Sequence, residues 1–289
     1  MPVCALSVAG LTIRMDLDCE VEQTQAFLPF LTEAEIADYE ASFDLVGKLP
    51  SIPDKQIHED KCYRVHLNQE GNQIRSFFDA PNDFSAYAVA IYDYPAGRIR
   101  VSYLEKGKRC LSEIHNSFFH LGFESMLLYR ERLCFHAACV RTALGGILFS
   151  GPSGIGKSTQ AALWCQHRGA EQINGDRPIL SKGNGEWLAW GSPYAGSSHC
   201  YINASCPVRA IVMLRQAENC SLRRLSIKEA FRAIWSGLTV PAWDAKATEA
   251  ACDLTLELSA AVPVYEFGCT PDAAAVEFLE QGLGKDSAL

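Results

Sequence analysis

Apolar and polar residues alternate with a period of two through much of the first part of the chain. This alternation predicts strands within 7–17, and two further pairs of alternating segments flank the turn sequences NQEGNQ and PAG, which predicts two hairpins. Residues 30–43 have the spacing of a helix, and residues 111–133 place their apolar side chains on one helical face. The first part of the chain is therefore predicted to be mainly β, with one or two helices.

From Cys134 onward the pattern changes to buried strands and helices. Two apolar strands joined by the turn TALGG lead into a glycine-rich loop and a helix from Lys157 to about His167. Strands are also predicted at 187–190, in RAIVML and in PVYEF, and helices at 227–236, 246–260 and 272–281. The pattern predicts an α+β chain of two domains, a mainly β domain in 1–130 and an α/β domain in 131–289.

Composition narrows the classes of partner. The 289 residues carry a formal net charge of -8 without a long Lys/Arg run, which argues against binding to nucleic acid or to an anionic membrane surface. No apolar run reaches the ~18 residues of a membrane span, and the N-terminal segment acquires acidic residues early, unlike a signal peptide. A cytoplasmic protein is expected. The cysteines and histidines lack the spacing of a zinc site.

The stretch GPSGIGKST fits the phosphate-binding pattern GxxxxGKS, between a predicted strand and a predicted helix. Glycines let such a loop curl so that its N–H groups point inward, and the helix adds its positive end. We expect Mg²⁺ and ATP to bind here, with Lys157 at the β- and γ-phosphates and Ser158 on the metal. The predicted nucleotide-binding residues are Gly151, Pro152, Ser153, Gly154, Ile155, Gly156, Lys157, Ser158 and Thr159.

Three further residues are candidates for the chemistry. Asp176, in NGDRP, is placed to be the metal-binding acid, although Asn-Gly-Asp is also a common turn composition. Arg177 beside it either clamps a phosphate or is solvated. His136 is predicted on a strand before the loop, where a histidine is either a core residue or a catalytic one.

Three segments in order, FHAACV, GPSGIGKST and NGDRP, resemble the HPr kinase/phosphorylase-like family of the phosphoenolpyruvate carboxykinase-type P-loop fold. The similarity continues through GSPYAGSSH and VRAIVMLRQAENCSLRRLS, whereas the N-terminal domain shows no matching motif. The resemblance implies a P-loop kinase core with a mixed β-sheet. It also implies ATP-dependent phosphorylation of a hydroxyl group.

The resemblance also implies roles for single residues. His136 becomes an active-site residue near the transferred phosphate, and Asp176 becomes a metal ligand or a base. One departure concerns Gly175, because HPr kinases have two consecutive acids where this chain has Gly175 and Asp176. Ser197 and Ser198 stand where basic residues are common in relatives. Arg215 either faces the nucleotide or caps a solvent edge.

The main hypothesis is a kinase in which Ser158 and Asp176 hold Mg²⁺, Lys157 and Arg177 neutralise the γ-phosphate, and His136 or Asp176 accepts the proton of the acceptor. The acceptor is open between a peptide or protein serine, free serine and a small hydroxylated metabolite, and so is assembly into a homo-oligomer. The alternative from another class is an ATP-sensing regulatory module without phosphotransfer, which the missing acid favours. Carboxykinase chemistry and a binding scaffold with a vestigial loop are further alternatives.

Overall fold

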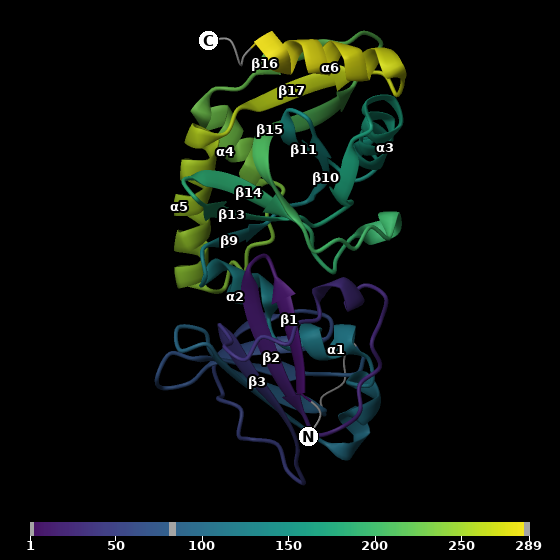
Figure 1. Ribbon diagram of the computed structural model, residues 1–289. Coiled ribbons are helices and arrows are strands. Elements are labelled where there is room, and N and C mark those ends of the chain that lie inside the picture. The colour runs from purple at the N-terminus through teal and green to yellow at the C-terminus, as the bar shows by residue number, and fades with distance from the viewer. Residues whose placement is uncertain (1–2, 81–84, 286–289) are drawn as a thin grey trace. The chain divides into compact units, whose positions relative to one another are not determined.

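The computed structural model describes residues 3–80 and 85–285 (Figure 1). The chain divides into two compact units. Unit 1 contains Met1–Tyr129 together with the short segment Pro241–Ala245, and unit 2 contains Arg130–Val240 and Lys246–Leu289. Each unit combines a mixed β-sheet with helices, so the chain is of the α+β class that the sequence predicts.

Unit 1 is built on an eight-stranded sheet in the order β1-β2-β3-β8-β7-β6-β5-β4. Strand β3 runs parallel to β2 and β8, and the hairpins predicted around NQEGNQ and PAG are confirmed as the antiparallel pairs β5–β6 and β7–β8. The elements are β1 (Val3–Val8), β2 (Leu11–Leu17), η1 (Leu28–Phe30), β3 (Tyr39–Leu45), β4 (Gln56–Glu59), β5 (Tyr63–Leu67), β6 (Gln73–Phe77), β7 (Ala88–Asp93), β8 (Arg98–Tyr103) and η2 (Glu105–Cys110).

The helix predicted for 30–43 is wrong, because this segment enters strand β3. Tyr39, Ala41 and Phe43 alternate into the core with at most 2% of their surface exposed. A strand places every second residue on one face, whereas a helix would turn one of these side chains outward. The pairing of β3 with two parallel neighbours that are distant in sequence outweighs the local helical spacing.

The single amphipathic helix predicted for 111–133 is also corrected, since two short helices, α1 (Ile114–Phe119) and α2 (Phe123–Leu128), occupy its place. Gly122 lies between them with φ 64°, in the left-handed region that favours glycine. A Cβ on this residue would also lie 2.8 Å from the guanidinium carbon of the buried Arg75. The helix therefore breaks at a glycine that both the turn and the close approach require.

A neutral histidine is buried in unit 1. His120 is 1% exposed, with its Nδ1 2.7 Å from the Asn116 carbonyl oxygen and its Nε2 2.9 Å from the Tyr87 hydroxyl. Because a carbonyl only accepts, Nδ1 is assigned the proton and Nε2 accepts from Tyr87. Burial lowers the pKa of His120 to about 4.

This burial predicts a loss of stability in acid. An unfolded chain binds a proton at His120 near the ordinary pKa of 6.5, and the folded chain does so only near 4. Stability is therefore complete above pH 6.5 and is lost as the pH falls toward 4, by roughly 3 kcal/mol from this residue. Urea unfolding of His120→Gln should show a smaller acid loss than wild type. The exposed His115→Gln is the control, and an unchanged acid loss in His120→Gln would contradict the assignment.

Unit 2 is built on a nine-stranded mixed sheet, as the resemblance implies. Its path is β12-β10-β11-β15-β14-β13-β9, with β17 beside β15 and β16 beside β17. Strands β11, β15 and β17 are parallel, and the hairpin β10–β11 is antiparallel. The strands are β9 (Arg132–Cys134), β10 (Ala137–Thr142), β11 (Gly145–Ser150), β12 (Glu171–Asn174), β13 (Ile179–Gly183), β14 (Glu186–Trp190), β15 (Ser205–Gln216), β16 (Ser221–Arg224) and β17 (Val264–Cys269).

Four α-helices accompany this sheet, and all four follow the sequence prediction to within a few residues at their ends. They are α3 (Lys157–Arg168), α4 (Ile227–Trp235), α5 (Ala245–Ala261) and α6 (Ala273–Lys285). Trp164 of α3 and Leu279 of α6 are both buried in one apolar cluster with strands of the sheet, so these helices cover the same face (Figure 1). Within the described ranges, no helix has the length and apolarity to cross a bilayer.

Candidate functional site

The glycine-rich loop connects β11 to α3 and leaves the start of the helix open. Gly154 and Gly156 have φ values of 78° and 116°, which a residue with a side chain rarely adopts. Gly156 is the N-cap of α3, and no side chain in the described part of the protein accepts a hydrogen bond there. The first N–H groups of this 12-residue helix are therefore available to an anion.

Lys157 is folded back onto its own loop. Its Nζ donates to the carbonyl oxygens of Gly151 at 3.1 Å and of Pro152 at 3.2 Å, and only 9% of its surface is exposed. Burial lowers the pKa of Lys157, and the charge of Arg177 acts in the same direction, whereas Asp176 opposes it. A negatively charged ligand at the loop would offer this ammonium group a stronger partner than two neutral carbonyls.

A cavity of about 290 Å³ lies at this loop. It is lined by His136, Ser153, Gly154, Gly156, Lys157, Ser158, Thr159, Gly175, Asp176, Gly196 and Ser197. Six of the predicted nucleotide-binding residues are in this wall. Gly151 and Pro152 instead hold the Lys157 amine, and Ile155 packs against the apolar core of unit 2.

His136 lies between strands β9 and β10 and belongs to neither, which corrects its predicted place within a strand. Strand β10 pairs with β11, the strand that leads into the loop, and the pairing sets Ala137 opposite Ser150. The Ser150 hydroxyl donates to the His136 carbonyl oxygen at 2.8 Å, and the His136 N–H donates to the Gly237 carbonyl at 2.8 Å. The imidazole is thus held beside the loop by backbone pairing.

His136 and Asp176 lie together at the cavity. The Nε2 of His136 is 3.3 Å from Oδ1 of Asp176, and the two side chains are 29% and 34% exposed. The N–H of Ala137 donates to the Asp176 carbonyl at 3.1 Å, so the backbone also ties the two residues. Burial lowers the pKa of His136, as do the positive charges of Lys157 and Arg177, while Asp176 raises it. The net effect favours a neutral imidazole, which can accept a proton.

Asp176 is positioned by a turn that the buried Asn174 organises. Oδ1 of Asn174 accepts from the N–H groups of Asp176 at 2.9 Å and of Arg177 at 2.7 Å, which is an Asx-type turn. Its Nδ2 donates to the carbonyl oxygen of the buried Ser192 at 3.2 Å. The sequence NGD has two interpretations, a turn and a functional acid, and the structure is compatible with both, because the turn places Asp176 in the cavity wall.

Arg177 lies beside this acid but outside the residues that line the cavity. Its Nη1 donates to the hydroxyl of Thr239 at 2.6 Å, and its Nε is 3.5 Å from Oδ2 of Asp176. Thr239 lies in the segment that follows α4, far from Arg177 in sequence, and no motif in the sequence predicts this contact. Arg215, near the end of β15, is likewise absent from the cavity wall.

The structure has no room for an acidic side chain at position 175. A Cβ on Gly175 would overlap the Ser198 side chain and lie 2.9 Å from the amide nitrogen of Gln172. Gly196, which lies in the same turn as Ser198, is also close to this acid: a Cβ on Gly196 would lie 2.9 Å from Cβ of Asp176. The turn 195–199 is therefore packed directly against 174–176, and the space that a second acidic side chain needs is already filled.

This packing predicts the effect of a single methyl group. Gly175→Ala should lower the free energy of unfolding by about 1–3 kcal/mol, because the new Cβ has no room beside Ser198. Ser198→Gly should relieve most of that loss when the two changes are combined, since it removes the overlapping atoms. Urea unfolding of the two single variants and the double variant measures this coupling. Effects that simply add would contradict the close packing.

The donors at the cavity suit a magnesium ion. The hydroxyl of Ser158, in the first turn of α3, and the carboxylate of Asp176 are both oxygen donors in one wall. Mg²⁺ prefers oxygen ligands and is commonly held by one or two protein groups together with phosphate oxygens. The two residues predicted for the metal thus line one cavity and carry oxygen donors of the kind that such an ion takes.

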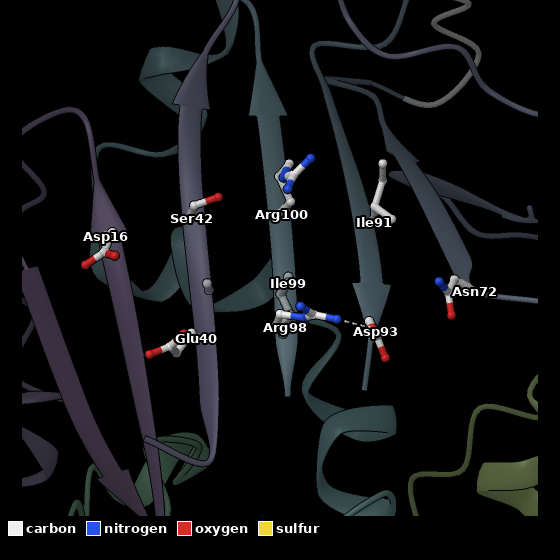
Figure 2. A pocket seen from close by; sticks show the side chains of 10 residues that line it. Asp16, Glu40, Ser42, Asn72, Ile91, Asp93, Arg98, Ile99 and Arg100 are labelled. Carbon is white, nitrogen blue, oxygen red and sulfur yellow. Dashed lines mark hydrogen bonds and ion pairs between the residues drawn. The ribbon is translucent and has the colours of Figure 1, made fainter. Parts of the chain in front are cut away.

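A second hollow, of about 460 Å³, lies on one face of the sheet of unit 1 (Figure 2). It is lined by Asp16, Glu40, Ala41, Ser42, Asn72, Ile91, Asp93, Arg98, Ile99 and Arg100. Arg98 donates to Asp93 at 3.2 Å across neighbouring strands, and the Arg98 side chain is 71% exposed. Opposite charges that pair in contact with water are typical of a solvated sheet face. None of the residues predicted for the chemistry lies in this hollow.

The chain matches no protein-family model and no curated protein. Among solved structures it is similar to the Hpr(Ser) kinase/phosphatase from Coxiella burnetii, with 16% sequence identity and a TM-score of 0.34. The similarity covers 54% of this chain and 99% of the other. At this TM-score the similarity supports no functional argument, and the proposed function rests on the residues of the cavity instead.

Proposed function

We propose that this chain is an ATP-dependent kinase that transfers the γ-phosphate to a hydroxyl group of a peptide, a protein or a small molecule. The observation that carries the proposal is the pair formed by His136 and Asp176, 3.3 Å apart, in the wall of the same cavity as Lys157. A glycine-rich loop alone supports nucleotide binding, whereas a base and an acid beside it support transfer. The mixed sheet around the loop supports a core of the HPr-kinase-like type.

The loop and the helix start bind the phosphates in this mechanism. The N–H groups after Gly156 point to the triphosphate, and Lys157 exchanges its two carbonyl partners for phosphate oxygens. Ser158 and Asp176 would hold Mg²⁺, and the ion would supply positive charge beside the phosphates. Arg177, whose Nε is 3.5 Å from Oδ2 of Asp176, contributes positive charge beside the cavity. Positioning and charge stabilisation account for most of the acceleration.

His136 serves as the base. A kinase with two adjacent acids can assign one to the metal and one to the acceptor proton, and here the space for the first acid is filled by Ser198. The neutral imidazole of His136 supplies the second function, while Asp176 keeps the metal. Its Nε2 faces the Asp176 carboxylate and therefore carries the ring proton, so Nδ1 is the atom that accepts the proton of the hydroxyl. Asp176 also stabilises the imidazolium that forms when the proton arrives.

Radiolabelled ATP tests the proposal. The protein is incubated with Mg²⁺, labelled ATP and serine, serine-containing peptides or a cell lysate, and products that carry a phosphate are identified by mass spectrometry. Transfer of label to a hydroxyl supports the kinase. Tight ATP binding without transfer would instead favour the ATP-sensing module, and absence of ATP binding would contradict both.

The pH dependence of transfer tests the base. Because burial and the charges of Lys157 and Arg177 lower the pKa of His136, kcat/KM should stay level as the pH falls through 6.5 and decline only below it. His136→Asn should remove this decline and lower the rate. A wild-type decline that begins above pH 6.5, or the same decline in His136→Asn, would assign the base to another residue.

A further inference from the structure

A serine hydroxyl of the chain itself stands in the proposed transfer cavity. Ser197 belongs to the turn η3 (Gly196–Ser198) and lines the cavity together with Lys157 and Asp176. The preceding residue, Gly196, is packed against Asp176, as shown by the 2.9 Å that would separate a Cβ at 196 from Cβ of Asp176. Ser197 is thus one residue from a direct contact with the acid of the site.

The hydroxyl of the neighbouring Ser198 makes hydrogen bonds, whereas that of Ser197 makes none with the described residues. Ser198 donates to the Ala195 carbonyl at 2.6 Å and accepts from the Cys200 N–H at 3.2 Å, so its hydroxyl stabilises the turn. Within the described ranges, Ser197 has no hydrogen-bond partner for its side chain, and the residue is exposed. A free hydroxyl in the cavity meets the first requirement of a phosphate acceptor, which is access to the γ-phosphate.

We propose that Ser197 is a phosphorylation site that the chain modifies in its own cavity, an inference that rests on the proposed kinase function. The Ser197 oxygen forms a bond to the γ-phosphorus, the bond between the γ-phosphorus and the bridging oxygen breaks, and ADP leaves. The hydroxyl proton passes to the imidazole of His136, the base of the proposed kinase. No oxidant or further reactant is required, because ATP supplies the phosphoryl group.

Phosphorylation at this position has a consequence for the site. A phosphoserine carries a charge of about −1.5 to −2 at neutral pH and would stand in the cavity whose wall also contains Asp176 and Lys157. The modified side chain would compete with the γ-phosphate of a new ATP for Lys157. The modified protein should therefore bind ATP more weakly than the unmodified protein.

Mass spectrometry of the full-length protein tests the inference. After incubation with Mg²⁺ and labelled ATP without an added acceptor, the tryptic peptide 183–209 should carry one phosphate, and its fragment ions should place it on Ser197. Ser197→Ala should lose this phosphate, Ser197→Thr should carry it as phosphothreonine, and Lys157→Ala should show none. Phosphate on Ser198 instead of Ser197 would overturn the assignment.

Two further measurements separate this inference from the proposed function. ATP turnover with an added hydroxyl acceptor while Ser197 stays unlabelled would overturn the self-modification and leave the kinase in place, whereas no ATP binding at all would overturn both. To test transfer within one molecule, active Ser197→Ala is mixed with Lys157→Ala, which keeps Ser197. Absence of label on the Lys157→Ala chain supports transfer within one cavity, and label there would overturn it.

Discussion

Lys157→Ala is expected to lower the rate of phosphoryl transfer by about a thousandfold or more. The Lys157 ammonium group lies in the cavity wall, and among the described residues its hydrogen-bond partners are two neutral carbonyl oxygens, which a phosphate can replace. Alanine removes that charge where negative charge builds up during transfer. The measurement is the initial rate of label transfer from ATP, with ATP binding determined separately.

Lys182→Ala is the matched control for this variant. Lys182 is a half-exposed lysine of β13 that pairs with Glu257 and lies outside the cavity. Its loss removes one positive charge from the same unit, and the transfer rate should stay near that of wild type. A transfer rate in Lys157→Ala equal to that of wild type would contradict the kinase hypothesis. Equal losses of transfer rate in Lys157→Ala and Lys182→Ala would indicate a general effect of charge.

Asp176→Asn is expected to lower transfer by roughly 100- to 10,000-fold with the fold retained. The amide keeps the size of the side chain, and the backbone N–H still donates to Asn174, so the turn remains. The charge that suits Mg²⁺ is lost, and so is the negative group that raises the pKa of His136. Both the metal site and the base are therefore weakened by one change.

The measurements for this variant are the transfer rate, its dependence on Mg²⁺ concentration and the unfolding midpoint. A higher Mg²⁺ requirement at an unchanged midpoint is the expected pattern. Asp253→Asn, an exposed acid on α5, is the control and should leave all three values unchanged. A wild-type rate in Asp176→Asn would show that this carboxylate takes no part in the transfer.

In unit 2 the sequence predicted the elements well because each carries its own signal. The glycines and Lys157 mark the loop, the helix α3 follows at the predicted residue, and the apolar runs of β10 and β11 mark buried strands. In unit 1 the hairpins with clear turn residues were predicted correctly. The segment 30–43 was not, since its local spacing suits a helix while its strand β3 depends on β2 and β8, which are far away in sequence.

The sequence by itself determined the glycine-rich loop and its helix, because both follow from residues a few positions apart: glycines, which adopt positive φ here, and the lysine and serine of the first helical turn. Only the tertiary structure decided the rest of the site. The pairing of β10 with β11 places His136 next to the loop, and the Asn174 turn brings Asp176 to it. Ser198 fills the space beside Gly175, a contact between residues too far apart for any periodicity to report.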